Sequence, residues 1–135
     1  MKIIITGATG FIGHAIAKHL LLQKHEVYAI IRPQTHRDKL PQGISTFIDT
    51  SDTKALNQFF QETQADGILH LASLILVNHK AEDIEPLILS NISFSTRLLE
   101  VSVKHNLKWF INTGTFWQHY NDEEYNPVNL YADPF

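Results

Sequence analysis

The chain has 135 residues, with 14 acidic and 11 basic side chains and a formal charge of −3 at neutral pH. This length suits one domain with a single hydrophobic core. The charge balance and the lack of a Lys/Arg-rich run exclude a surface that neutralises nucleic-acid phosphates, and the absence of Cys excludes a disulfide framework and a thiolate nucleophile. The apolar runs are far shorter than the roughly 20 residues that cross a bilayer, and the first one is too short for a signal peptide. We therefore expect a soluble, cytoplasmic protein without a nucleic-acid or membrane partner.

Short apolar runs predict the strands of a sheet. The first run is all β-branched and ends at Thr6-Gly7, which is typical of a strand buried on both faces. The predicted strands cover residues 3–5, 27–31, 44–48, 68–72 and 109–111.

Helical periodicity separates these strands, over residues 11–22 and 53–64. A longer helical pattern over residues 87–103 leaves two helices possible, because Pro86 fits best near a helix start. Strands that alternate with helices in this way predict an α/β fold, a doubly wound parallel sheet with helices on both faces.

A glycine-rich loop lies between the first predicted strand and the first helix. Gly7, Gly10 and Gly13 follow the spacing G-x-x-G-x-x-G, one residue longer in its first gap than the dinucleotide fingerprint. Gly7 permits a sharp turn, Gly10 leaves room for a pyrophosphate, and Gly13 lets the helix pack closely on the sheet. The helix N-terminus adds free N–H groups for phosphates. The alternative is a tight turn without a ligand, which three glycines in register disfavour.

With this loop in place, the chain resembles the extended short-chain dehydrogenase/reductases. Within them it is similar to the NAD-dependent epimerase/dehydratase family, which acts on nucleotide sugars. The eight residues from Thr6, TGATGFIG, match the family's cofactor loop at every defined position. The resemblance implies a Rossmann-type domain whose dinucleotide contacts include Gly7, Gly10, Phe11, Ile12 and Gly13.

Further stretches resemble the family in the same order along the chain. Asp49 and Thr50 follow the third predicted strand and match residues beside the adenine ring. Leu71, Ala72 and Ser73 match the stretch that passes the ribose and nicotinamide, and Asn91 matches a position on the long helix. The resemblance implies that these six residues contact the cofactor. From the residues alone, Asp49 is equally a turn-forming or capping Asp, and Asn91 a polar residue on a helix surface.

The resemblance also implies two catalytic residues. Thr115 would hydrogen-bond the substrate hydroxyl, and Tyr131 would remove its proton while the nicotinamide takes the hydride. The family's Tyr-x-x-x-Lys motif requires Lys four residues after Tyr131, where this sequence has Phe135. In the family that Lys lowers the pKa of the Tyr and holds the ribose, which Phe cannot do. We therefore expect residues 1–135 to be an incomplete NAD(P)-binding Rossmann domain, truncated after about five strands, without the catalytic Lys or a substrate domain.

The choice between NAD and NADP depends on Arg32. An acidic residue at the end of the second strand would bind the ribose 2′-hydroxyl of NAD, whereas an Arg can bind the 2′-phosphate of NADP. The sequence has Arg32 at this place, which favours NADP slightly; a solvated Arg is the alternative.

No metal site is predicted, because the eight His are scattered and no pair has the i, i+4 spacing of helical ligands. His70 falls in a core strand and is interpreted as a buried, hydrogen-bonded His or a cofactor-side contact. Asp52 is interpreted as the cap of the following helix.

Three hypotheses for function follow. The first is the N-terminal cofactor-binding part of an NAD(P)-dependent nucleotide-sugar epimerase, dehydratase or reductase, whose full-length parent could be a homodimer. The second is a non-catalytic NAD(P)-binding or sensor module, and the third is an inactive truncated fragment. Cofactor affinity without turnover would support the sensor, and the lack of affinity for either cofactor would contradict both of the first two.

Overall fold

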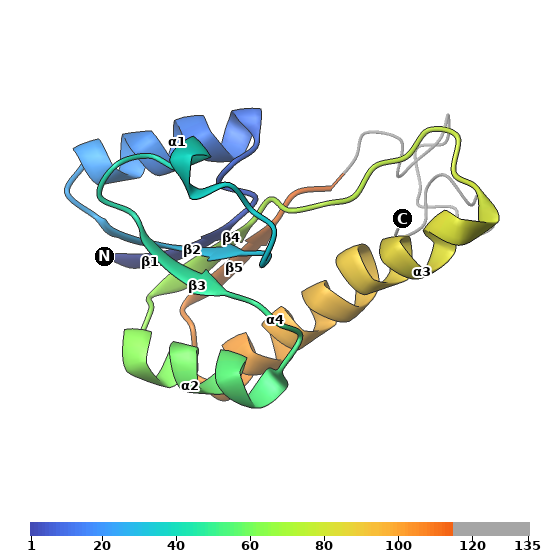
Figure 1. Cartoon of the computed structure of the whole chain (residues 1–135). Helices are drawn as coiled ribbons and strands as arrows, with labels where there is room; N and C mark the ends of the chain where they lie inside the picture. Colours follow the sequence, from blue (N-terminus) through green and yellow to red (C-terminus); the bar gives the residue numbers. More distant parts are fainter. Residues whose placement is uncertain (115–135) are drawn as a thin grey trace, which may run out of the picture.

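Five parallel strands form one sheet in the order β3-β2-β1-β4-β5, and the computed structural model describes residues 1–114 of the chain (Figure 1). The strands are β1 (Lys2–Thr6), β2 (Glu26–Ile31), β3 (Ser45–Ile48), β4 (Gly67–His70) and β5 (Trp109–Asn112). The chain adds β2 and β3 on one side of β1 and then places β4 and β5 on the other. In such sheets, ligands bind outside the carboxyl ends of the strands where the order changes direction, here at β1 and β4. The predicted α/β, doubly wound parallel sheet is confirmed.

Helices cover both faces of this sheet, as Figure 1 shows. The helices are α1 (Phe11–Leu22), α2 (Thr53–Thr63), α3 (Ile84–Leu87) and α4 (Phe94–Lys104), with 3₁₀ turns at Arg37–Lys39 and Ala81–Asp83. Side chains alternate along a strand, so neighbouring residues of β1 enter different cores. Ile5 packs in the core with Ala17 of α1. Ile4 packs on the other face with Leu56 of α2 and Leu98 of α4.

Within residues 1–114, none of the helices has the length and apolar character that crossing a bilayer requires.

The helical pattern predicted over residues 87–103 begins earlier and is not uniform. α3 leads directly into a π-helical segment, Ile88–Ser93, which leads directly into α4. Pro86 lies in the first turn of α3, where its missing N–H is tolerated. π-helical turns are rare and occur frequently at functional sites. This one contains Asn91.

β4 ends at His70, two residues before the predicted end at position 72. The reason is that the backbone N–H groups of Leu71 and Ala72 turn toward Thr6 and donate to its hydroxyl oxygen. The chain therefore leaves the sheet at the carboxyl edge of β1. The other predicted strands and the first two helices agree with the structure to within one residue at each end.

The amino edge of the sheet is held by Asp66. Its carboxylate accepts the Lys2 backbone N–H at 2.8 Å and forms an ion pair with Lys108. The Lys108 ammonium and then the Lys2 N–H hold the pKa of Asp66 below its ordinary value. Asp66 therefore links the start of β1 to the residue before β5, at the edge of the sheet opposite the glycine loop.

Candidate functional site

The glycine loop forms a turn in which Gly7 and Gly13 leave no room for a Cβ atom. Gly7 has φ +72°, and a Cβ there would lie 2.9 Å from the Ala72 nitrogen. The Gly10 N–H donates to the Gly7 carbonyl at 3.0 Å. A Cβ on Gly13 would lie only 2.1 Å from that same carbonyl oxygen. Gly13 therefore allows α1 to begin directly against the turn. The atoms nearest to Gly13 belong to the turn and not to the sheet, against which the sequence predicted close packing.

The N-terminus of α1 is open. Gly10 is its N-cap residue and supplies no side-chain hydrogen bond, and the first turn contains no acidic residue. The side chains of Phe11 and Ile12 beside it are 95% and 62% exposed. Free N–H groups and the partial positive charge of a helix start suit an anionic group such as a phosphate.

Thr6 holds the chain after β4 against this turn. The Thr6 side chain is fully buried, and its hydroxyl oxygen accepts the N–H groups of Leu71 and Ala72 at 3.1 and 3.0 Å. Gly7, Leu71 and Ala72 are thereby brought together at the carboxyl edge of β1 and β4. Ser73 follows and is exposed.

His70 is buried between two hydroxyl groups. Its Nδ1 lies 2.7 Å from Thr6 Oγ1, and its Nε2 lies 2.8 Å from Ser95 Oγ on α4. Burial lowers the pKa of His70 to about 4, so the ring is neutral at physiological pH. The interpretation of His70 as a buried, hydrogen-bonded residue is confirmed.

Asn91 holds the same stretch of chain further along. The Leu74 N–H donates to Asn91 Oδ1 at 2.8 Å, and Asn91 Nδ2 donates to the Leu74 carbonyl at 2.9 Å. Asn91 is therefore not simply a polar residue on a helix surface, because its amide pairs with the backbone of a segment 17 residues earlier. The stretch from Leu71 to Leu74 is fastened at one end by Thr6 and at the other by Asn91.

Asp49 directly follows β3 and forms a bidentate ion pair. Arg97 of α4 donates to its two carboxylate oxygens at 3.0 and 2.8 Å, and the side chains are 11% and 16% exposed. The Arg97 guanidinium lies 5.6 Å from the centre of the Phe94 ring. Thr50 follows and is exposed. Sequence reasoning missed Arg97, whose only signal was a charge on a helix that packs on the sheet.

The remaining predicted residues are placed less closely or not at all. Arg32 is exposed directly after β2, at the carboxyl edge. Asp52 caps α2 as predicted, with its carboxylate accepting the Lys54 N–H at 2.8 Å. Thr115 and Tyr131, with Phe135, lie outside the described residues. Within residues 1–114, no group of three His, Cys, Asp or Glu side chains could hold a metal ion.

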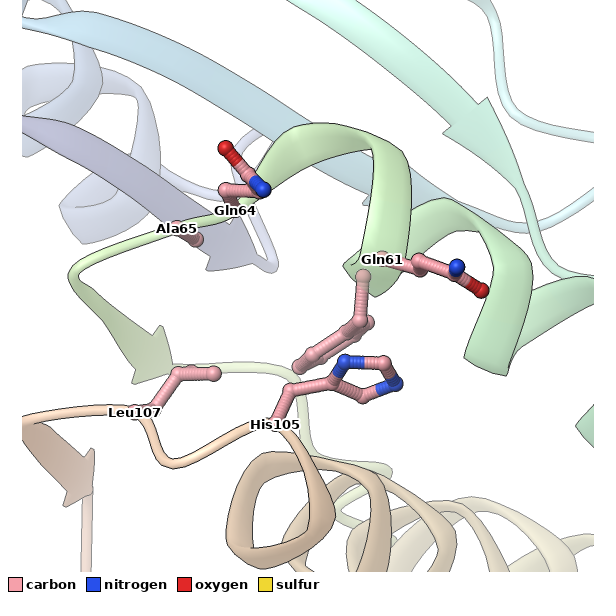
Figure 2. A pocket seen from close by; sticks show the side chains of 6 residues that line it. Gln61, Gln64, Ala65, His105 and Leu107 are labelled. Carbon is pink, nitrogen blue, oxygen red and sulfur yellow. The ribbon is translucent and has the colours of Figure 1, made fainter.

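A separate hollow of about 300 Å³ opens at the other edge of the sheet, where α2 and α4 end (Figure 2). Its lining residues are Phe60, Gln61, Gln64, Ala65, His105 and Leu107. The His105 ring lies beside the helix that carries Gln61, and its Nε2 lies 3.0 Å from Asn57 Oδ1. None of the predicted cofactor contacts lines this hollow.

Comparison with known proteins decides the family. The model of the NAD-dependent epimerase/dehydratase family matches residues 3–133. The chain belongs to this family.

Relatives of this epimerase/dehydratase chain include enzymes of known reaction. The dTDP-glucose 4,6-dehydratase of Salmonella typhimurium is 29% identical in an alignment 115 residues long, which covers 78% of this chain and 32% of that protein. The Thermus thermophilus UDP-glucose 4-epimerase, solved in complex with NAD, matches with a TM-score of 0.71 at 26% identity, over 82% of this chain and 36% of that one. The Thermotoga maritima UDP-glucose 4-epimerase, solved with UDP-glucose, matches with a TM-score of 0.74 at 25% identity, over 85% of this chain and 38% of that one. The chain spans 32% to 44% of the length of the first curated relatives that it matches.

Proposed function

We propose that this chain is the cofactor-binding N-terminal part of a nucleotide-sugar epimerase or dehydratase, and that it binds NAD(P) at the carboxyl edge of β1 and β4. The observation that carries the proposal is the glycine turn. A Cβ on Gly13 would stand 2.1 Å from the Gly7 carbonyl, so the turn requires glycine where the start of α1 presses against it. The cradle fits a dinucleotide, because the N–H groups of the α1 N-terminus are left without a side-chain cap.

Different groups of the described residues would contact different parts of the cofactor. The glycine turn, with the backbone of Phe11 and Ile12, would hold the pyrophosphate, and Leu71 to Ser73 would pass beside the ribose and nicotinamide. Asp49 and Thr50 would lie beside the adenine, with Arg97 fixing the carboxylate of Asp49. Asn91 would act by holding this edge in place through Leu74. When bound, the nicotinamide supplies a hydride acceptor and donor.

Arg32 is the residue that favours NADP. It is exposed at the end of β2, and no acidic side chain occupies this position. The Thermus thermophilus relative was solved with NAD, so the family accommodates that cofactor. A guanidinium at this position gives the 2′-phosphate a charge-assisted partner that NAD lacks.

The catalytic roles of Thr115 and Tyr131 rest on the sequence match. Nucleotide sugars are the proposed substrates of the whole protein, since the relatives act on dTDP-glucose or were solved with UDP-glucose. With Phe135 in place of the motif Lys, we expect the 135-residue chain to bind cofactor without turning it over. That result is also what the non-catalytic binding module predicts.

A homodimer of the full-length protein is part of the same proposal. Apolar side chains that are 37% to 69% exposed lie along the helix from α3 to α4, namely Ile84, Ile88, Leu89, Ile92, Leu99 and Val103. An exposed apolar row of this kind is typical of a surface that another chain covers. A cytoplasmic location also stays a prediction of the sequence.

The test of this function is titration calorimetry of the 135-residue chain with NAD and with NADP. Saturable binding of either cofactor, with a lower affinity in the Gly10→Val variant, is expected. Gly10 is exposed and a Cβ there would approach only the Gly7 carbonyl, at 3.3 Å, so the variant tests the ligand's approach more than the fold. The lack of binding to either cofactor in a folded chain would contradict the proposal.

A further inference from the structure

His70 is the buried titratable group that the proposed cofactor contacts do not use. It ends β4, is 2% exposed, and lies between Thr6 of β1 and Ser95 of α4. The rings of Phe94 and Phe110 flank the imidazole, with centres 5.5 and 6.1 Å away. The ring therefore connects three elements of the cofactor edge.

The direction of the hydrogen bonds around this ring is fixed by the Thr6 hydroxyl. A hydroxyl has two acceptor positions and one hydrogen. Both acceptor positions of Thr6 Oγ1 are filled, by the N–H groups of Leu71 and Ala72. Its hydrogen must therefore point to His70 Nδ1, 2.7 Å away. Nδ1 is an acceptor, and the neutral ring carries its proton on Nε2.

The remaining hydrogen bonds of this network follow from the tautomer of His70. His70 Nε2–H donates to Ser95 Oγ at 2.8 Å, and the Ser95 hydroxyl donates to the Asn91 carbonyl at 2.7 Å. Asn91 sits in the π-helical segment, and its side-chain amide pairs with both backbone groups of Leu74. Every bond from Ala72 to Asn91 therefore runs in one direction through His70.

We infer that His70 is a positioning residue. In its Nε2–H tautomer it links Thr6, which holds residues 71–72, to Asn91, which holds Leu74, and so fixes the chain after β4. Its effect on a bound cofactor rests on the proposed function, whereas its effect on the chain after β4 does not. The Ser95 hydroxyl takes the carbonyl of Asn91, which lies in the π-helical segment and whose amide holds Leu74.

A second proton on the ring would break this arrangement. The Nδ1–H of a charged imidazole would face Thr6 Oγ1, and Thr6 would have to release Leu71 or Ala72 to accept it. Among the described residues, the side chains of β1, α4 and β5 that contact the ring are uncharged, and the Arg97 guanidinium beside Phe94 is paired with Asp49. Burial, which lowers the pKa of His70, acts in the same direction.

The tautomer is measured by long-range ¹H–¹⁵N correlation NMR of the 135-residue chain labelled at histidine. His70 is recognised as the signal missing from the spectrum of a His70→Gln variant. We expect protonated Nε2 and unprotonated Nδ1 at neutral pH. A protonated Nδ1 in the neutral ring would overturn the inference.

A pair of serines on one helix tests the coupling. Ser95 and Ser102 both donate to the carbonyl four residues earlier, at 2.7 Å, but only Ser95 contacts His70. We expect the Leu74 amide to exchange with solvent on the order of tenfold faster in Ser95→Ala and at an unchanged rate in Ser102→Ala. Ser95→Thr keeps the hydroxyl and is expected to keep the slow exchange. Equal rates in the two alanine variants would contradict the inference.

Cofactor titration of the same variants separates the two proposals. If the unmodified chain binds NAD or NADP, Ser95→Ala is expected to weaken that binding more than Ser102→Ala does, and equal weakening would count against a role of His70 at the cofactor. If the unmodified chain binds neither, the proposed function fails, while the tautomer and the Leu74 exchange still decide the positioning role.

Discussion

Arg97 donates to both carboxylate oxygens of Asp49, at 3.0 and 2.8 Å, and so ties α4 to the end of β3. The two residues are 48 positions apart in the chain. Both side chains are largely buried, at 16% and 11% exposed, so the pair is screened less than an ion pair on the surface. The carboxylate that we propose as an adenine contact is therefore held in one orientation by α4.

Removing Arg97 should destabilise the fold. In Arg97→Met the Asp49 carboxylate stays largely buried without its partner, and we expect a loss of about 2 kcal/mol in the free energy of unfolding. Urea denaturation measures this loss. Lys104→Met, an exposed change of the same charge on the same helix, serves as the control and should change stability by no more than about 0.5 kcal/mol. Adding Asp49→Asn to Arg97→Met should recover part of the loss, and strict additivity would show that the two residues do not interact.

Gly13→Ala should be much more harmful than Gly10→Ala. Ala within a helix normally gains about 1 kcal/mol over Gly. At Gly13, however, the new Cβ would lie 2.1 Å from the Gly7 carbonyl, and because both are backbone, the turn itself would have to move. We expect a net loss above about 2 kcal/mol. At Gly10 the nearest atom is 3.3 Å away, so the loss should stay below about 1 kcal/mol. Thermal unfolding of the two variants side by side would reveal the opposite ranking if the turn were loose.

His70 should make stability depend on pH in acid. Its folded pKa is about 4 and its ordinary value is 6.5, so the unfolded chain binds more protons between these values. The contribution is complete above pH 6.5 and is lost as the pH falls toward 4, by about 3 kcal/mol in all. Urea denaturation at several pH values measures the slope.

The His70→Asn variant isolates this contribution from that of the carboxylates. The variant should lose the slope between pH 6.5 and 4, even if it is less stable at every pH. His19→Asn, which changes an exposed His, should keep it. If His70→Asn and the unmodified chain showed the same slope, the pKa of His70 in the folded chain would have to be close to its ordinary value.

Arg32→Ala should change the choice of cofactor. The variant loses the guanidinium proposed to bind the 2′-phosphate, and we expect affinity for NADP to fall on the order of tenfold relative to NAD. Calorimetric titration with both dinucleotides gives the ratio. Lys104→Ala removes the same charge far along the chain, at the end of α4, and should leave the ratio unchanged. An unchanged ratio in Arg32→Ala would mean that Arg32 is a solvated side chain.

Local patterns in the sequence were enough to predict the sheet and most of its helices. The β-branched residues of β1, the helical spacing after Gly10 and the Asp52 cap act through neighbours in the chain. The prediction for the end of β4 was wrong by two residues, because Thr6, on another strand, takes the backbone N–H groups of Leu71 and Ala72. Apolar character continues through these residues, so hydropathy alone could not mark where the strand ends.

The site was predicted as a set of positions but not as a network. The family resemblance pointed to Asn91, yet nothing in the spacing indicated that its amide would pair with Leu74 or that Ser95 would link it to His70. Arg97 was missed for the same reason. These contacts join residues that only the finished sheet brings together, and their polar side chains look like ordinary helix surface in the sequence. The roles of Thr115 and Tyr131 remain predictions.

The strand order also determines when the site can form during folding. β1 pairs with β2, which follows it closely, and with β4, whose His70 contacts Thr6 across 64 residues. During synthesis the first three strands can assemble while the other edge of β1 is still unpaired. Closing so long a loop is slow, and an unpaired strand edge invites pairing with other chains. The step that completes the cofactor edge is therefore also the step that covers the unpaired edge of the central strand in the nascent chain.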